Sequence, residues 1–170
     1  MKNQINSSGQ TLLEVIVVIA VGIIIVGVLV FATIFSLRNA NSAKTNAQAT
    51  KLAQEGLEKV RISRDRSGTI AGFPPGSWVD ATFWSTNISV STCIPPQNCY
   101  FKLDSGDLLY NGSFETPPLT QGESIGNFTR FIILSDDGNF ASWKIVESVV
   151  SWSDFSGLHQ SRVKTVLRKL

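Results

Sequence analysis

A run of 23 residues without a charged side chain, Val15 to Leu37, restricts most strongly what this chain can fold into. Valine, isoleucine and leucine dominate the run, and Gly22, Gly27, Thr33 and Ser36 are its only mild interruptions. At about 1.5 Å per helical residue, a helix of this length spans roughly the 30 Å of a bilayer core. The sequence therefore predicts one membrane-spanning helix near the N-terminus.

The rest of the chain has the composition of an ordinary soluble domain. The protein has 170 residues, a formal net charge of +2, two cysteines and one histidine. These values suit a single modest domain attached to the apolar segment. The near-neutral charge does not favour a general nucleic-acid binder, so we expect one anchor, the lipid bilayer as its surroundings, and one exposed domain.

The N-terminus does not have the pattern of a cleaved secretory signal. The apolar run is longer than the 7 to 15 residues of a typical signal core, and no small-residue cleavage site follows it. The flanking charges, Lys2 on one side against Arg38, Lys44 and Lys51 on the other, do not settle the orientation. The charge count by itself leans towards an inside C-terminus.

Helical spacing continues beyond the membrane-length run. Small or apolar residues recur every three or four positions, which fits a helix with one buried stripe. We expect the helix to run from about Thr11 to Arg64, with Gly56 as a local cost and Gly68 as a stop. The predicted stripe consists of Ala40, Ala43, Ala47, Thr50, Ala53, Leu57 and Val60.

From Thr69 onward the sequence is rich in glycine, proline, serine and aromatic residues, which predicts loops and short strands. The clearest strand signal is Phe128 to Trp152, where two strand-like runs flank the turn sequence SDDGN. A last run, Ser161 to Leu170, can add a third strand. This order predicts an α+β fold, with a long N-terminal helix packed against a C-terminal antiparallel sheet.

The N-terminal sequence GQTLLE, Gly9 to Glu14, followed by the apolar run, resembles the type IV prepilin processing motif. That motif is usually written G-F-T-L-x-E ahead of a hydrophobic helix. The resemblance implies that a prepilin peptidase cuts on the cytoplasmic side between Gly9 and Gln10 and then N-methylates Gln10. It also implies that the C-terminal domain faces outward. The family normally has phenylalanine after the cut, where this chain has Gln10.

A lone acid, Glu14, stands at the start of the apolar run, where a charge is costly. The resemblance implies that it pairs with the N-terminal amine of a neighbouring subunit when helices bundle in a filament. Such a pair sets the register of the helices more than it adds stability, because desolvation offsets much of the attraction. The alternative is that Glu14 only places a negative charge at the positive end of a membrane helix.

The helix segment 49–61 resembles the same segment of minor pilins and pseudopilins, and residues 128–167 resemble the ending of minor pilins of the V type and I/J-type pseudopilins. Residues 69–126 are unmatched. The resemblance implies a structural subunit of a type IV pilus or type II secretion-like filament in the cytoplasmic membrane, with its C-terminal domain outside. Its partners would be the prepilin peptidase, other pilin or pseudopilin subunits and the inner-membrane assembly platform. The runner-up is a single-pass anchored extracellular binding or adhesion domain that does not polymerise. The expected divisions are a leader at 1–9, a transmembrane helix half at 10–37, an amphipathic half at 38–66 and a β-rich head at 67–170.

The two cysteines, Cys93 and Cys99, enclose five residues. This spacing is too wide for a redox CxxC motif, and the chain offers no further ligands for zinc. If the domain lies outside the cytoplasm we expect a disulfide, and if it lies inside we expect two free thiols.

The sequence favours no catalytic or metal site. His159 is the only histidine, falls in a predicted turn and has no nucleophile motif beside it. The segments Asp104–Asp107 and Asp136–Asn139 fit turn chemistry better than calcium binding. Basic clusters at 61–66 and 162–169 are typical of a protected sheet edge and a solvated helix end rather than of phosphate contacts. We expect no cofactor, and we expect the four tryptophans to serve in packing: Trp78, Trp84, Trp143 and Trp152.

Overall fold

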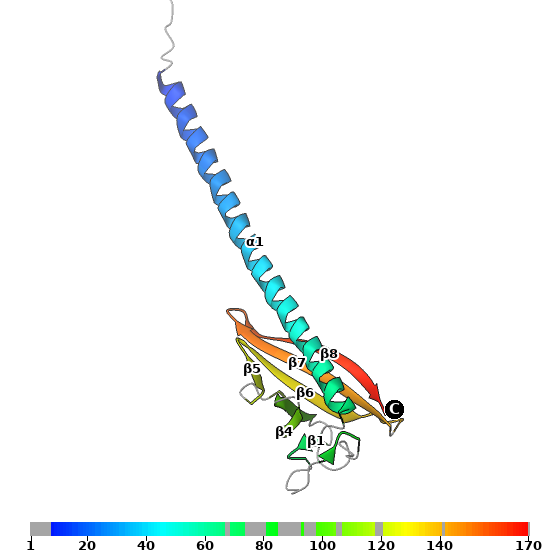
Figure 1. The fold of residues 1–170 in the computed structure, drawn as a ribbon. Helices are drawn as coiled ribbons and strands as arrows, with labels where there is room; N and C mark the ends of the chain where they lie inside the picture. Colours follow the sequence, from blue (N-terminus) through cyan, green and yellow to red (C-terminus); the bar gives the residue numbers. More distant parts are fainter. Residues whose placement is uncertain are drawn as a thin grey trace, which may run out of the picture. The chain divides into compact units, whose positions relative to one another are not determined.

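The computed structural model describes residues 8–66, 69–73, 81–84, 93, 98–104, 107–117, 121–140 and 142–169. Within these ranges the chain forms one α-helix and eight β-strands (Figure 1). The elements are α1 (Ser8–Asp65), β1 (Thr69–Ala71), β2 (Ala81–Thr82), β3 (Asn98–Asp104), β4 (Asp107–Phe114), β5 (Glu123–Ile125), β6 (Phe128–Asp136), β7 (Trp143–Asp154) and β8 (Gly157–Arg168).

The long helix predicted from the sequence is confirmed, with ends close to those expected. No proline falls between Ser8 and Asp65, and leucine, alanine, glutamate and lysine favour a helix in its second half. The chain divides into two compact units inside this helix, the first ending at Thr45 and the second beginning at Asn46. The two units are described separately below.

The sheet of the second unit has the strand order β2-β1-β4-β3-β6-β7-β8, and β5 pairs with the free part of β6. The predicted α+β class and the hairpin around SDDGN are confirmed, because β6 and β7 pair antiparallel on either side of that turn. The predicted third strand, β8, pairs with β7 over its full length. The sheet is mixed rather than purely antiparallel, since β1 runs parallel to β4, to which it is joined by a long connection.

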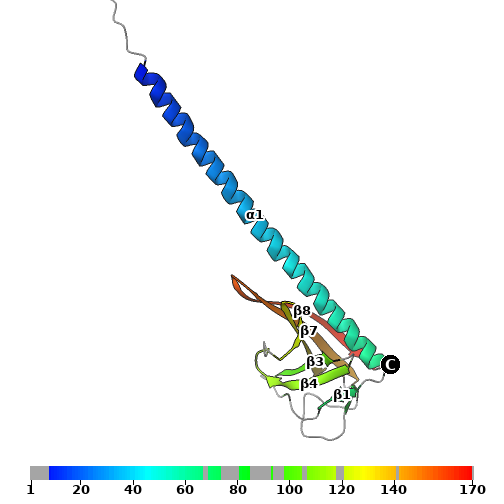
Figure 2. The same ribbon diagram turned by 60° about the vertical axis from the view of Figure 1, so that its left-hand side comes forward.

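The part of α1 that belongs to the second unit lies across one face of the sheet, over β6, β7 and β8 (Figures 1 and 2). Its apolar side chains Leu57 and Val60 pack with those of the strands in one buried cluster. Burying this apolar area is the main driving force for holding the helix against the sheet. The strand residues of the cluster include Phe101, Ile132, Leu134, Val146 and Leu167.

The buried stripe of α1 is only partly the predicted one. Ala53, Leu57 and Val60 are buried as expected, but Ala47 is exposed because it lies more than half a turn around the helix from the buried Ala49. Two further predicted members, Ala40 and Ala43, are exposed and belong to the first unit. The buried positions are Ala49, Ala53, Gly56, Leu57, Val60 and Ser63.

At Gly56 the helix lies very close to the sheet, whereas a Cβ atom at Gly22 or Gly27 would meet nothing among the described residues within 4 Å beyond its own turn of the helix. A Cβ atom at this position would lie 2.6 Å from Ser148 Oγ on β7 and 2.9 Å from Arg130 Cδ on β6. Both distances are shorter than real carbon contacts allow. The glycine that reads as a helix-weakening residue in the sequence is therefore required by the packing of helix on sheet.

The side chain of Arg130 is buried beneath α1, with 1% of its surface exposed. Its Nε donates a hydrogen bond to Glu123 Oε2 on β5 at 2.8 Å, and Nη2 makes an ion pair with the same oxygen. Its Nη1 donates to the backbone carbonyl of Leu52 on α1 at 2.9 Å. The guanidinium thus joins the helix to two strands while its charge is compensated.

A second carboxylate completes this network from the helix side. Glu55 Oε1 lies 3.7 Å from Arg130 Nη1 and 2.9 Å from Lys59 Nζ. The hydrogen bond from Lys59, aided by the two positive charges, lowers the pKa of Glu55. The carboxylate is therefore ionised at neutral pH and its stabilising contribution is lost as the pH falls below the ordinary glutamate range.

Replacing Gly56 with alanine tests the close approach. In an exposed helix the change would stabilise by about 1 kcal/mol, but here the methyl group meets Ser148 and Arg130, and overpacking costs about 1–3 kcal/mol. We expect Gly56→Ala to lower the free energy of unfolding of the detergent-solubilised chain, measured by urea denaturation. Gln54→Ala, on the exposed face of the same turn, is the matched control and should leave stability within about 0.5 kcal/mol. A gain in stability for Gly56→Ala would contradict the packing described.

Candidate functional site

The first unit consists of the apolar part of α1, from Ser8 to Thr45. Every large apolar side chain from Leu12 to Leu37 is exposed within the chain. Among the described residues, α1 is the one helix long and apolar enough to cross a membrane. Exposing this much apolar surface to water is unfavourable, so the segment needs lipid or other apolar helices around it.

The residues of the prepilin-like motif lie in the first turns of α1. The helix begins at Ser8, so Gly9 and Gln10 have helical backbone, and residues 1–7 of the predicted leader lie outside the described ranges. Glu14 is exposed and follows Gln10 by four residues in the sequence. Cleavage, methylation and docking at these positions stay predictions.

The β7–β8 hairpin ends in a cluster of polar side chains that the sequence analysis did not foresee. Asp154 Oδ1 accepts hydrogen bonds from the backbone N–H of Ser156 at 2.7 Å and from its hydroxyl at 2.6 Å. His159 Nε2 lies 2.9 Å from the same oxygen and 2.8 Å from Ser156 Oγ. The prediction that His159 lies in a turn is wrong, because the loop has only two residues and β8 already begins at Gly157.

An aspartate, a histidine and a serine in contact raise the question of a catalytic triad, and the geometry argues against one. In a triad the carboxylate and the serine contact opposite nitrogens of the imidazole, whereas here Asp154 and Ser156 both contact Nε2. The three side chains also stand on an exposed hairpin tip, and His159 stacks on the indole of Trp152 with ring centroids 5.5 Å apart. The arrangement fixes the turn; it is not set up to activate a nucleophile.

The hydrogen bonds within this turn lower the pKa of the Asp154 carboxyl. The hydrogen bonds from the hydroxyl and the backbone N–H of Ser156, with a smaller contribution from His159, lower its pKa from 3.8 to about 2. A carboxyl whose pKa is depressed on folding stabilises the fold above its unfolded pKa, and this contribution is lost as the pH falls towards 2.

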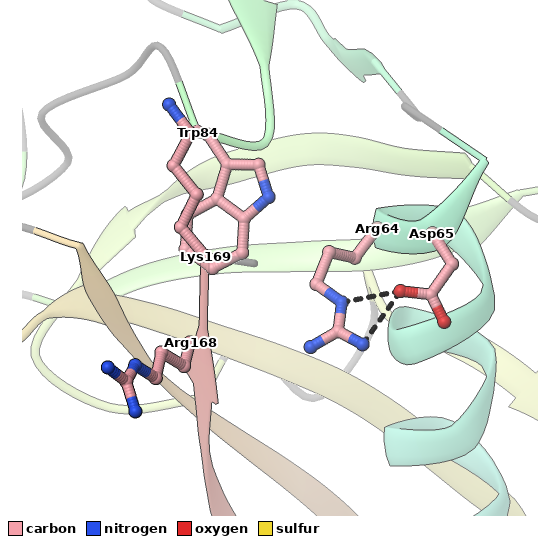
Figure 3. A pocket seen from close by; sticks show the side chains of 5 residues that line it. All are labelled: Arg64, Asp65, Trp84, Arg168 and Lys169. Carbon is pink, nitrogen blue, oxygen red and sulfur yellow. Dashed lines mark hydrogen bonds and ion pairs between the residues drawn. The ribbon is translucent and has the colours of Figure 1, made fainter.

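A cavity of about 360 Å³ lies where the C-terminal end of α1 meets the end of β8 (Figure 3). The side chains of Arg64 and Asp65 come from the helix, and Arg64 Nε and Nη2 both lie 2.7 Å from Asp65 Oδ1. Arg168 and Lys169 add two positive charges, and Trp84 adds an aromatic wall. Arg64 from one basic cluster and Arg168 and Lys169 from the other therefore line one cavity suited to an anionic group.

Two other members of these basic clusters are paired with acids on the surface. Arg61 forms an ion pair with Glu58, one turn earlier on α1, and Arg162 pairs with Glu147 across the β7–β8 ladder at 3.1 Å. Exposed pairs of this kind are worth little to stability. Arg61 lies on the solvated side of the helix and Arg162 on the edge strand β8, as the sequence pattern indicates.

The segment Asp136–Asn139 forms a turn held by an aspartate. Asp137 Oδ1 accepts hydrogen bonds from the backbone N–H groups of Asn139 at 2.8 Å and Phe140 at 3.2 Å, which is the way aspartate commonly stabilises a turn. Asp104 and Asp107 face each other across the β3–β4 hairpin. Within the residues that the structure describes, no group of three or more His, Cys, Asp or Glu could hold a metal ion.

Cys93 and Cys99 are joined in a disulfide, with Cα atoms 5.4 Å apart. Both are buried in the cluster that also contains Leu57 and Val60 of α1. Residues 94–97, between the cysteines, lie outside the described ranges. The bond ties residue 93 to the start of β3 and so to the core beneath the helix.

Two structural centres, Arg130 and the hairpin-tip cluster, were missed by the sequence analysis. A weak signal existed for each: Arg130 interrupts an otherwise apolar strand, and Asp154 precedes Phe155-Ser156-Gly157 as an aspartate does at the start of a tight turn. Comparison of the chain with protein-family models, with curated proteins and with solved structures finds no match.

The acidity of Asp154 can be measured directly. We expect its carboxyl, followed by NMR in the full chain, to titrate at about pH 2. Ser156→Ala removes the largest cause of the shift and should move the midpoint towards 3.8, while Ser153→Ala, on the adjacent residue, should leave it unchanged. A wild-type midpoint near 3.8 would show that the turn does not hold the carboxylate as described.

The disulfide predicts a simple chemical result. Freshly extracted protein, denatured without reductant, should not react at Cys93 or Cys99 with an alkylating reagent, and its mass should be two hydrogens below that of the dithiol form. Reduction before alkylation is the internal control and should modify both residues. Two reactive thiols without reduction would place the domain in a reducing compartment.

Proposed function

We propose that the protein is a non-enzymatic structural subunit, a minor pilin or pseudopilin, of a type IV pilus or type II secretion-like filament. In this proposal a prepilin peptidase cleaves between Gly9 and Gln10, and Gln10 is then N-methylated. The head, residues 67–170, faces outward from the cytoplasmic membrane, and the lipid bilayer and the assembly platform hold the subunit before assembly.

One observation carries the proposal: the motif Gly9 to Glu14 stands at the start of a single helix with two different halves. The first half is apolar and exposed within the chain, and the second half is built into the core of the head. A subunit of this kind can sit in a bilayer as a monomer and exchange lipid for neighbouring helices as a filament forms. The apolar surface needs a cover in both states.

Glu14 has a specific role in this proposal. Once the leader is removed, the new amine of Gln10 in one subunit can pair with Glu14 of a neighbour inside a helix bundle. The pair compensates a carboxylate that would otherwise be buried without a partner, and it selects one stagger between helices over others. Assembly, rather than membrane insertion, then depends on this side chain.

Support for catalysis as the main activity is weak. The Asp154, Ser156 and His159 side chains meet on an exposed tip through a single imidazole nitrogen. The basic cavity at Trp84 suits an anion and supplies no nucleophile among the side chains that line it. A purely extracellular binding domain that never polymerises is the alternative, and the tests below separate the two.

Processing is tested at the glycine before the cut. We expect wild-type protein produced with a prepilin peptidase to begin at Gln10, as read by N-terminal sequencing. Gly9→Val should remain uncut, because a bulky side chain prevents the backbone from entering the peptidase site. Gly27→Val, the same change farther along the helix, should be cut normally. Normal cleavage of Gly9→Val would contradict processing at this motif.

Assembly is tested at Glu14. Glu14→Leu should insert and be cleaved at least as well as wild type, because it removes a charge from the membrane edge. Breaking a buried pair on one side costs about 3–5 kcal/mol, roughly a hundredfold or more in an assembly equilibrium. The variant should therefore accumulate as processed membrane-bound monomer and be absent from sheared filaments, whereas Glu14→Asp should assemble in part. Incorporation of Glu14→Leu at the wild-type ratio would remove the docking role.

A further inference from the structure

The tip of the β7–β8 hairpin presents two large apolar side chains to the outside of the head. Phe155 is 87% exposed and Leu158 is 51% exposed. Tight turns usually carry small or polar residues, so a phenylalanine in a two-residue loop is unusual chemistry for a surface that meets only water. The two exposed side chains lie three residues apart in the sequence, and we call them the apolar tip of the hairpin.

The backbone at this tip is held firmly. Asp154 and Gly157 pair across the hairpin, so the loop consists of Phe155 and Ser156 alone. The carboxylate of Asp154 receives the hydrogen bonds of Ser156 and His159, and Gly157 has the positive φ of 124° that closes the turn. The tip therefore loses little conformational entropy when it binds to another surface.

The tip lies at the end of the head where α1 enters it. Thr50 Oγ1 lies 3.1 Å from Ser161 Oγ, and farther along the helix Arg61 Nη2 donates to Thr165 Oγ1 at 3.3 Å. Rising residue numbers on α1 thus match rising numbers on β8, so the start of β8 faces the start of this helical segment. Figures 1 and 2 agree in placing the hairpin tip at that end of the sheet.

The tip also projects beyond the first residues of the second unit. From Ser161 back to Gly157 the strand covers about 13 Å, whereas from Thr50 back to Asn46 a helix covers only about 6 Å. Eight residues, 38–45, separate the apolar segment of α1 from this unit. These eight residues are a connection short enough for the tip to reach the surface of a membrane that the apolar segment spans.

We propose that Phe155 and Leu158 insert into the interfacial layer of the same membrane that holds α1, so that the hairpin tip is a second, shallow membrane contact of the head. The chemistry fits a lipid surface, because aromatic and aliphatic side chains gain by leaving water at the headgroup level. Asp154, at the base of the turn, remains among the headgroups with its carboxylate hydrogen-bonded. The contact fixes which side of the head faces the membrane surface while the protein is a membrane-bound monomer. The inference rests on the membrane anchoring in the proposed function and is independent of cleavage and polymerisation.

The test uses the full chain in phospholipid vesicles, with a polarity-sensitive fluorophore on single introduced cysteines. The native cysteines are in a disulfide and do not react with the label. Phe155→Cys reports the tip. Phe140→Cys is the matched control, because Phe140 is also an exposed phenylalanine in a hairpin loop but lies at the opposite end of β7. Ile24→Cys, within the apolar segment, reports whether α1 is inserted.

We expect nitroxide-bearing lipids to quench the label at 155 several-fold more strongly than the label at 140, with a blue-shifted emission at 155 only. Equal quenching at 155 and 140, with strong quenching at 24, would overturn the tip contact while leaving the anchor intact. A blue shift at 155 without lipid quenching would mean a protein neighbour covers the tip, and would also overturn it. Absence of quenching at 24 would instead show that the anchoring itself fails.

Hydrogen exchange of the unlabelled chain provides an independent reading that does not rely on a fluorophore at the tip. The amides of residues 153–158 should exchange more slowly in vesicles than those of a Phe155→Ser variant, while residues 137–142 should exchange equally in both. Identical exchange at the tip in the two proteins would contradict the membrane contact.

Discussion

One buried arginine, Arg130, joins α1 to the sheet, and the position of the helix on the sheet depends on it. Arg130 extends from β6 beneath α1, is compensated by Glu123 on β5, and donates to the Leu52 carbonyl of the helix. A charge removed from water is tolerated only when its partners are all in place. The helix can therefore occupy essentially one register on the sheet, and Gly56 permits the close approach that this register requires.

This register matters because the two parts of α1 suit different surroundings. Up to Leu37 its side chains suit lipid or a bundle of other helices, and from Ala49 onward one side of it belongs to the core of a water-exposed head. Apolar packing by Leu57 and Val60 supplies most of the burial, but it is not directional, whereas the hydrogen bonds of Arg130 are.

The sequence analysis predicted correctly the elements that depend on residues close together in the chain. The uncharged run, the three- and four-residue spacing after it, and the SDDGN turn led to α1 and the β6–β7 hairpin, and the order of elements led to the α+β class. The burial of Arg130 could not be read in this way, because its helix partner Leu52 lies 78 residues away. The stripe was misplaced at Ala47 for a related reason, since only the sheet decides which side of a partly apolar helix is covered. The two-residue turn that brings His159 to Asp154 depends on the pairing of β7 with β8.

A double-mutant cycle on Arg130 and Glu123 tests most directly the claim that this buried pair fixes the helix on the sheet. Within the described residues, Arg130→Met leaves Glu123 with only the longer ion pair to Lys59, whose Nζ lies 3.8 Å from Glu123 Oε1. It also leaves the Leu52 carbonyl without the Arg130 donor. The change should lower the free energy of unfolding of the solubilised chain by about 3–5 kcal/mol. Adding Glu123→Gln should recover much of that loss, giving a coupling energy of about 0.5–3 kcal/mol. Additive effects of the two changes, or a loss below about 0.5 kcal/mol for Arg130→Met, would contradict the account. Apolar packing alone would then hold α1 against the sheet.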